Sequence, residues 1–145
     1  MKIKPLTKRQ LAKLAPKEDD DLILFVIYLT RRFGEYGFHH SANERKCSRR
    51  YGAELKAKGQ KKGFLDVIIF VSPTLREKLT ETGPVPYKGM VIELKRITES
   101  NKKGGGLTKE QVKWGIAMIN HGYISGVCYG LNEAIEFVER YYGRG

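Results

Sequence analysis

The chain has 145 residues, 41% of them hydrophobic, which suits one folded domain and argues against global disorder. Its 27 Lys and Arg residues exceed its 16 Asp and Glu residues, giving a formal net charge of +11. In a globular domain, such an excess favours an anionic partner, most commonly nucleic acid, over a basic surface kept only for solubility.

The apolar runs and the cysteines disfavour several other classes of protein. The longest apolar run, residues 22–29, has eight residues, far fewer than the roughly 20 that span a bilayer. No apolar signal segment follows the basic start. Cys47 and Cys128 lack the spacing of zinc ligands and are expected to be reduced thiols. We therefore expect a cytoplasmic protein without a membrane span, in the host cytoplasm if the chain is viral.

The N-terminal segment is polar and rich in lysine. Residues 1–18 contain two prolines and are expected to form an arm or a short helix. Residues 19–33 are predicted to form a helix, since three aspartates at the start and two arginines at the end complement the helix dipole. Their β-branched and aromatic content also suits a strand. If helical, the segment forms part of a dimer interface or covers a sheet.

The middle of the chain is predicted to hold one helix and two strands. The helix begins near Ser41 or Asn43, with Asn43 as the N-cap, and stops at Gly59. The strands are residues 64–71, expected to be largely buried on both faces, and residues 89–95. We expect them to pair antiparallel, because the Pro-containing connection between them holds no convincing crossover helix.

The C-terminal part begins with a polar loop, residues 98–106, that ends in three glycines. The loop either touches nucleic acid with its two lysines or only connects its neighbours. A helix from 108 to about 121, a strand at 123–129 and a closing helix at 132–142 follow. The order of elements predicts an α/β fold, a small mixed β-sheet flanked by helices.

Three charged side chains interrupt the two apolar strands of the middle segment. Glu93 and Lys95 alternate along one strand and point to the same face, and Asp66 lies in the other. If the strands pair, two carboxylates meet, and a cation such as Mg²⁺ relieves their repulsion. Lys95 can then stabilise a developing oxyanion or help to hold a metal-bound hydroxide. An ordinary salt bridge between Asp66 and Lys95 at the sheet edge is the alternative.

Other polar residues have both functional and structural interpretations. Glu44, on the expected inward face of its helix, adds a third acid or only complements the helix N-terminus. Gln111 belongs to a capping-box sequence and is expected to cap its helix whatever else it does. His39 and His40, in a predicted loop, are interpreted as surface residues. Trp114 and Tyr123 are interpreted as core residues.

Taken together, these segments resemble the VRR-NUC family, a branch of the PD-(D/E)xK nucleases, over roughly residues 40–142. The matching segments are 41–44, 59–66, 89–96, 106–111, the strand after Gly122 and the closing helix. The resemblance implies a restriction-endonuclease-like core at residues 40–142. We expect residues 1–145 to form a single nuclease domain, in which residues 1–35, outside the match, form an arm and an extra helix. Leu65 stands where the family often has proline, which we expect to have little chemical consequence.

The resemblance also implies a Mg²⁺- or Mn²⁺-dependent DNA endonuclease. Lys95 would position or activate water, and Gln111 would orient Lys95. Small stand-alone members of the virus type look like homodimers that cut branched DNA such as four-way (Holliday) junctions, and a dimer suits paired cuts. The implied metal ligands are Asp66, Glu93, the backbone carbonyl of Leu94, and Glu44.

A basic stretch directly precedes the strand that holds Asp66. We expect it to grip phosphates on either side of the cut, which gives affinity without base sequence. Its members are Arg45, Lys46, Arg49, Arg50, Lys56, Lys58, Lys61 and Lys62.

Three other functions fit the sequence less well. A protein of the same fold that binds DNA junctions without cutting them is the chief alternative, and a nuclease that prefers flaps, single strands or RNA is another. An HNH-type nuclease built on His39, His40 and Asn43 leaves Asp66 and the pair of Glu93 and Lys95 unexplained.

Overall fold

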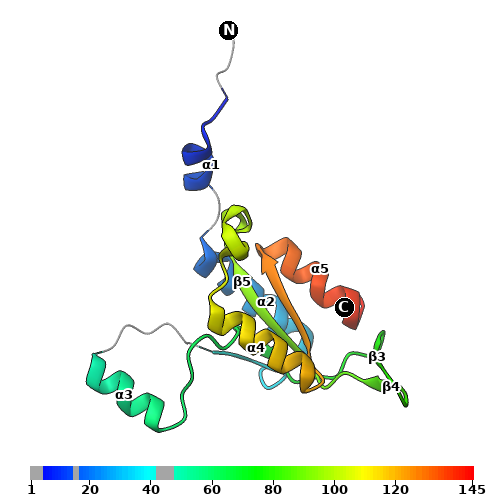
Figure 1. Ribbon diagram of the computed structural model, residues 1–145. Helices are drawn as coiled ribbons and strands as arrows, with labels where there is room; N and C mark the ends of the chain where they lie inside the picture. Colours follow the sequence, from blue (N-terminus) through cyan, green and yellow to red (C-terminus); the bar gives the residue numbers. More distant parts are fainter. Residues whose placement is uncertain (1–4, 15–16, 42–47) are drawn as a thin grey trace.

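The computed structural model describes residues 5–14, 17–41 and 48–145 (Figure 1). Within them, a four-stranded mixed sheet has the order β1-β2-β5-β6. Neighbours are antiparallel from β1 to β5, whereas β6 runs parallel to β5. The strands are β1 (Phe38–His40), β2 (Val67–Ile69), β5 (Met90–Lys95) and β6 (Ile124–Tyr129). The mixed sheet with flanking helices confirms the predicted fold class, including the antiparallel pairing of β2 with β5.

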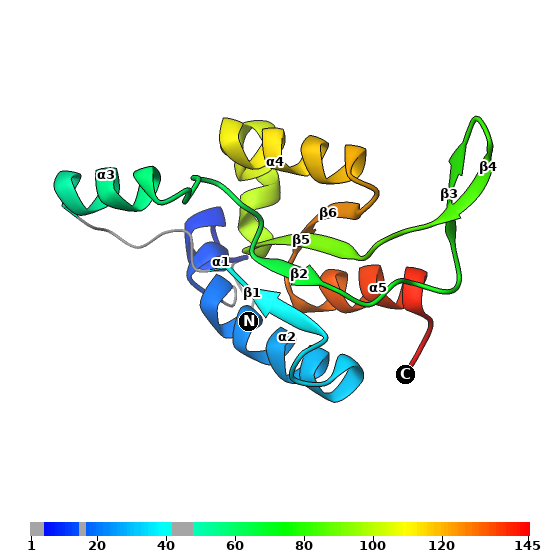
Figure 2. The ribbon, with the colours of Figure 1, turned by 90° about the horizontal axis from the view of Figure 1, so that it is seen from below.

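Helices cover both faces of the sheet (Figure 2). On one side lie α2 (Glu18–Phe33) and α5 (Leu131–Tyr142), and on the other lies α4 (Lys109–Asn120). This three-layer arrangement buries β5 completely, since all six of its residues are buried.

The two faces of β5 belong to two separate clusters of apolar side chains. Ile92 and Leu94 pack with Phe25 of α2 and Val138 of α5 in the larger cluster. On the other face, Val91 packs with Leu65 and with Met118 of α4. Because side chains alternate along a strand, Glu93 and Lys95 share the face of Val91 and point towards α4.

Most of the predicted elements are confirmed. The helix predicted at 19–33 is α2, which covers the sheet by burying Phe25 and Leu29. The predicted helix after residue 107 and the predicted closing helix are α4 and α5, and β6 lies between them. In the N-terminal segment α1 (Lys8–Leu14) is a short helix. No helix in the described ranges has the length and apolar character needed to cross a membrane.

The prediction for the second helix is wrong at its start and in its packing. Helix α3 (Arg49–Ala57) begins after Ser48, whose hydroxyl accepts a hydrogen bond from the backbone N–H of Tyr51. Ser48, rather than Asn43, is therefore its N-cap, and residues 42–47 lie outside the described residues. No residue of α3 is buried, so its expected inward face does not pack on the core. Gly59, with φ +97°, does follow the end of the helix as predicted.

Three strands were missed, and one was predicted too long. His39 and His40 lie in β1, at the edge of the sheet, instead of in a loop. The segment interpreted as a connection holds the hairpin of β3 (Glu77–Thr80) and β4 (Gly83–Pro86), which projects from the body (Figure 2). The strand predicted at 64–71 is limited to the three residues of β2, of which the middle one is only partly buried.

The polar loop before α4 contains two short 3-10 helices, η1 (Ile97–Asn101) and η2 (Lys103–Gly106). Gly104 and Gly105 both have positive φ, so the three glycines let the chain turn sharply between β5 and α4.

Candidate active site

Pairing of β2 with β5 brings the first acid to the site. The register sets Val67 opposite Ile92, so one step further along Asp66 lies opposite Glu93. The backbone N–H of Leu94 donates a hydrogen bond of 2.8 Å to Asp66 Oδ2. The main chain at Leu94 therefore lies against the Asp66 carboxyl, and the metal-binding role of its carbonyl stays a prediction.

Glu93 is the most deeply buried charged residue of the site, at 2% exposure. Its Oε1 accepts a hydrogen bond of 2.7 Å from Gln111 Nε2 and lies 3.4 Å from Lys95 Nζ. Its Oε2 is also buried, with no hydrogen-bond partner among the described residues. Leaving a buried carboxylate oxygen without a partner is costly, so the site favours a proton or a cation there.

The electrostatics of Glu93 agree with this geometry. Burial is the main cause that raises the pKa of Glu93 to about 8; the carboxylate of Asp66 acts in the same direction, and the Lys95 ammonium opposes both. In a buried site, a single ammonium on one oxygen does not compensate for two neighbouring carboxylates.

Gln111 caps its helix as predicted, while its expected role in orienting Lys95 stays a prediction. Its side-chain Oε1 accepts from the Thr108 N–H at 2.9 Å, and Thr108 Oγ1 accepts from the Gln111 N–H at 3.1 Å, which is the predicted capping box. Its Nε2 then reaches Glu93. Gln111 and Lys95 thus converge on Glu93 Oε1, and the start of α4 is fixed to β5.

Lys95 pairs with Glu93 of its own strand and is 8% exposed. The alternative of a simple cross-strand salt bridge with Asp66 at the sheet edge does not describe this arrangement, because β5 is central in the sheet and Lys95 is buried.

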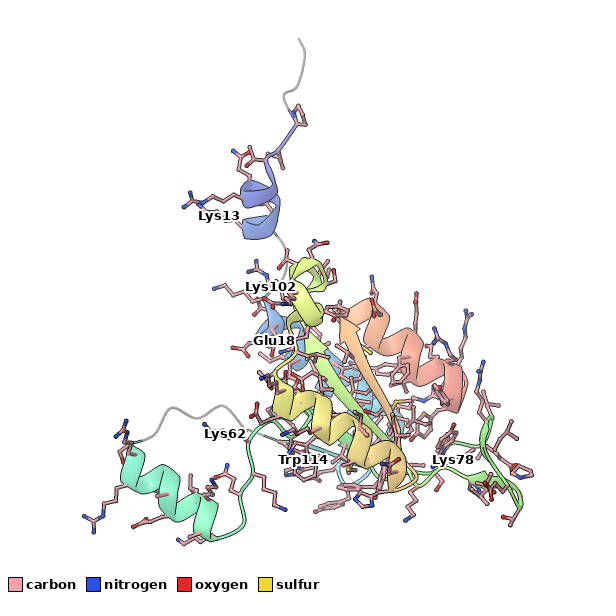
Figure 3. All side chains as sticks on the ribbon, viewed as in Figure 1. Lys13, Glu18, Lys62, Lys78, Lys102 and Trp114 are labelled. Carbon is pink, nitrogen blue, oxygen red and sulfur yellow. The ribbon has the colours of Figure 1, made fainter. Side chains whose placement is uncertain are left out.

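The structure adds an acid that the sequence reasoning missed. Glu18, the first residue of α2, lies at the end of the sheet where β5 ends (Figure 3), and its charge contributes to the raised pKa of Glu93. The expected third acid, Glu44, falls outside the described residues. Glu18 was assigned to the polar arm of residues 1–18, and only the three aspartates that follow it were interpreted, as a complement to the helix dipole.

The basic stretch is exposed wherever the structure describes it. Its described members on α3 and on the segment leading to Asp66 are Arg49, Arg50, Lys56, Lys58, Lys61 and Lys62. Arg45 and Lys46 fall outside the described residues. Trp114 and Tyr123, both expected in the core, pack against the cluster of Leu65, Val91 and Met118 but are only partly buried.

The donors at the site suit a hard cation. Mg²⁺ keeps several waters and binds protein through one or two carboxylates, which matches Asp66 and Glu93 with the unpartnered Glu93 Oε2. No group of three or more His, Cys, Asp or Glu side chains that could hold a metal occurs in the described ranges, so His39 and His40 form no such cluster there.

Comparison with known proteins supports the fold at low sequence similarity. No family model and no curated protein matches the chain. A solved structure described as "VRR_NUC domain protein" is similar to it, with a TM-score of 0.64 and 22% sequence identity over 88% of each chain. The chain therefore has a VRR-NUC-like fold, as the resemblance of its motifs predicted.

Proposed function

We propose that the protein is a divalent-metal-dependent DNA endonuclease that hydrolyses phosphodiester bonds at the site of Asp66, Glu93 and Lys95. The observation that carries the proposal is the meeting of two carboxylates and a lysine in which Glu93 Oε2 is buried without a hydrogen-bond partner among the described residues. The VRR-NUC-like fold and the charge of +11 support a nucleic-acid substrate.

Asp66 and Glu93 would hold Mg²⁺ or Mn²⁺, with Glu18 near enough to add charge. When bound, the metal supplies a Lewis acid that polarises the phosphate and lowers the pKa of water. In the reaction water adds to phosphorus, and one phosphorus–oxygen bond of the backbone breaks.

The remaining residues of the site position the reacting groups. Lys95 offers an ammonium to the charge that develops on the phosphate oxygens, in a site from which water is largely excluded. Gln111 holds the Glu93 carboxylate in one orientation through its hydrogen bond of 2.7 Å. The exposed lysines and arginines before Asp66 bind phosphates on either side of the cut.

The proposal extends to branched DNA, such as four-way junctions, cut by a homodimer. Helix α2 exposes a stripe of Ile23, Leu24 and Ile27, each more than 40% exposed, on the side away from the core. An exposed apolar stripe of this kind suits an interface between two copies of the chain, and two sites related by a two-fold axis suit a symmetric junction. Sedimentation equilibrium of wild type and Leu24→Glu tests the dimer, because only wild type should sediment with twice the mass of one chain.

Cleavage assays test the activity. Wild type and Lys95→Ala are incubated with labelled four-way junction, flap, duplex and single-stranded DNA in Mg²⁺, Mn²⁺ or EDTA. We expect metal-dependent cutting by wild type and a loss of about 10²–10³-fold in Lys95→Ala, the usual effect of removing one group that stabilises transition-state charge. The exposed Lys88 provides the matched control, since Lys88→Ala removes the same charge elsewhere. DNA binding without cutting in any metal would refute the nuclease and favour a junction-binding protein.

Metal binding can be measured without DNA. Free Mn²⁺, followed by electron paramagnetic resonance, should fall when wild type is added and fall much less with Glu93→Gln. Equal uptake by the two proteins would place the metal elsewhere.

A further inference from the structure

Two aromatic rings and a lysine line a shallow groove beside the candidate active site. The rings of Phe64 and Trp114 meet edge to face, with centroids 4.9 Å apart and planes at 86°. Lys61 Nζ lies 5.9 Å from the centroid of the Trp114 ring. Trp114 Nε1 donates a hydrogen bond of 3.0 Å to the carbonyl of Lys62, so that the ring is fixed against the basic segment (Figure 3). The groove has a volume of about 270 Å³ and is lined by Gly59, Gln60, Lys61, Phe64 and Trp114.

The groove is built on the same two segments that carry the site. Trp114 follows Gln111 by three residues, which places both side chains on one face of α4 with a rise of about 4.5 Å between them. Phe64 precedes Asp66 by two residues in the segment that leads into β2. Gly63 packs so closely on the start of α4 that a Cβ there would lie 2.5 Å from Glu110 Cβ.

Packing alone does not account for the arrangement. Phe64 and Trp114 do cover the small cluster of Leu65, Val91 and Met118. Both rings nevertheless remain partly exposed, and Lys61 lines the groove beside them, with the exposed Lys62 next to it in the sequence. Aromatic faces within a basic groove are the arrangement with which proteins bind single-stranded nucleic acid, because every base presents a π-face and every nucleotide a phosphate.

We propose that this groove binds an unpaired DNA nucleotide next to the phosphate that is cut. Its base stacks on the aromatic pair, and Lys61 and Lys62 contact the adjoining phosphates. This inference rests on the proposed nuclease function and adds a substrate preference to it. A base within a continuous duplex is stacked on both sides and cannot reach the groove, so unpaired nucleotides at branch points, flaps and single strands are favoured.

The single tryptophan of the chain makes the contact directly observable. Trp114 fluorescence is excited selectively in EDTA, where no cutting occurs, while binding is followed separately by the anisotropy of labelled DNA. The probes are a single-stranded oligonucleotide, an oligonucleotide of equal length whose central nucleotides are abasic, and a blunt duplex. We expect strong quenching by the first and little by the other two. Equal quenching by the abasic oligonucleotide, or none when single-stranded DNA is fully bound, would overturn the proposal, as would failure of single-stranded DNA to bind.

Variants of Trp114 test how much stacking on its ring contributes to the affinity for single-stranded DNA. Trp114→Leu should weaken binding of the single-stranded oligonucleotide at least about fivefold and duplex binding less, whereas Trp114→Phe should restore most of the loss. Ile116→Ala truncates a 56%-exposed residue of the same helix and serves as the control. Circular dichroism verifies that each variant is folded. If Trp114→Leu does not fold, the fluorescence experiment on wild type tests the proposal by itself.

Failure of this inference is distinguishable from failure of the nuclease. If wild type cuts DNA in Mg²⁺ but Trp114 does not respond to unpaired bases, the groove proposal is wrong and the nuclease stands. If unpaired bases quench Trp114 but no metal supports cutting, the groove binds nucleotides and the proposed nuclease activity is wrong.

Discussion

Gly63 connects the segment that carries Asp66 to the helix that carries Gln111, so its replacement should disturb fold and site together. Its φ is +76°, and a Cβ there would lie 2.5 Å from Glu110 Cβ and 3.0 Å from the backbone nitrogen of Gln111. In Gly63→Ala the left-handed backbone costs about 1–2 kcal/mol. The steric overlap adds about 1–3 kcal/mol, because the backbone of α4 must move. We expect a total loss of about 2–5 kcal/mol in the free energy of unfolding.

Gly59→Ala is the matched control for this prediction. Gly59 has φ +97°, and nothing lies within 4 Å of the position of its Cβ, so alanine there bears only the backbone cost. Urea denaturation of both variants should therefore show Gly63→Ala less stable than Gly59→Ala by about 1–3 kcal/mol. Equal losses would refute the close contact between this segment and α4. If cleavage is established, Gly63→Ala should also cut more slowly than Gly59→Ala, since Gln111 is displaced.

Two further predictions concern the core. Phe25→Ala should lower the free energy of unfolding, measured in urea, by about 3–5 kcal/mol, because the ring is fully buried. Tyr36→Ala, at an 88%-exposed position, is the control and should change it by less than about 0.5 kcal/mol. Similar losses in the two variants would contradict the assigned burial. Burial raises the pKa of the Cys128 thiol from 9.0 to about 12. As the pH rises past 9 the unfolded chain releases this proton and the folded chain keeps it, so stability should fall. In Cys47→Ser, where Cys128 is the sole thiol, a thiol reagent at pH 9 should react only on unfolding, and immediate reaction would show that the thiol is accessible.

The half of the fold that carries the candidate site could be predicted from local sequence because its signals are strong. The apolar runs around Asp66 and around Glu93 and Lys95 favour buried strands, and the absence of a convincing crossover helix from the Pro-containing connection between them favours antiparallel pairing. The capping box of Thr108 fixed the start of α4 to the residue. Cross-strand proximity of the acids then followed from pairing alone.

Elements that are stabilised by contacts with distant parts of the chain could not be predicted from local sequence. Strand β1 has only three residues and is defined by its pairing with β2. Pro84 and Pro86 argue against a strand, yet β4 pairs with β3 in an isolated hairpin where proline is tolerated at an edge. Glu18 lies near enough to influence the charge of Glu93 only because α2 packs across the sheet, which no local pattern reveals. Trp114 does pack on the smaller core cluster as predicted, whereas its partial exposure depends on the course of the segment before Asp66.

The proposed nuclease activity is tested most directly by the Mg²⁺-dependent cleavage rate of a labelled four-way junction, compared between wild type and the double variant Asp66→Asn with Glu93→Gln. The substitutions keep the shape of both side chains and remove both charges, so circular dichroism should show an unchanged fold. Since second-shell changes at metal sites already cost about 10–100-fold, loss of both carboxylates should reduce the rate by more than about 100-fold and abolish its dependence on Mg²⁺. A double variant that cuts as fast as wild type, with the same response to Mg²⁺, would contradict the assignment of this site.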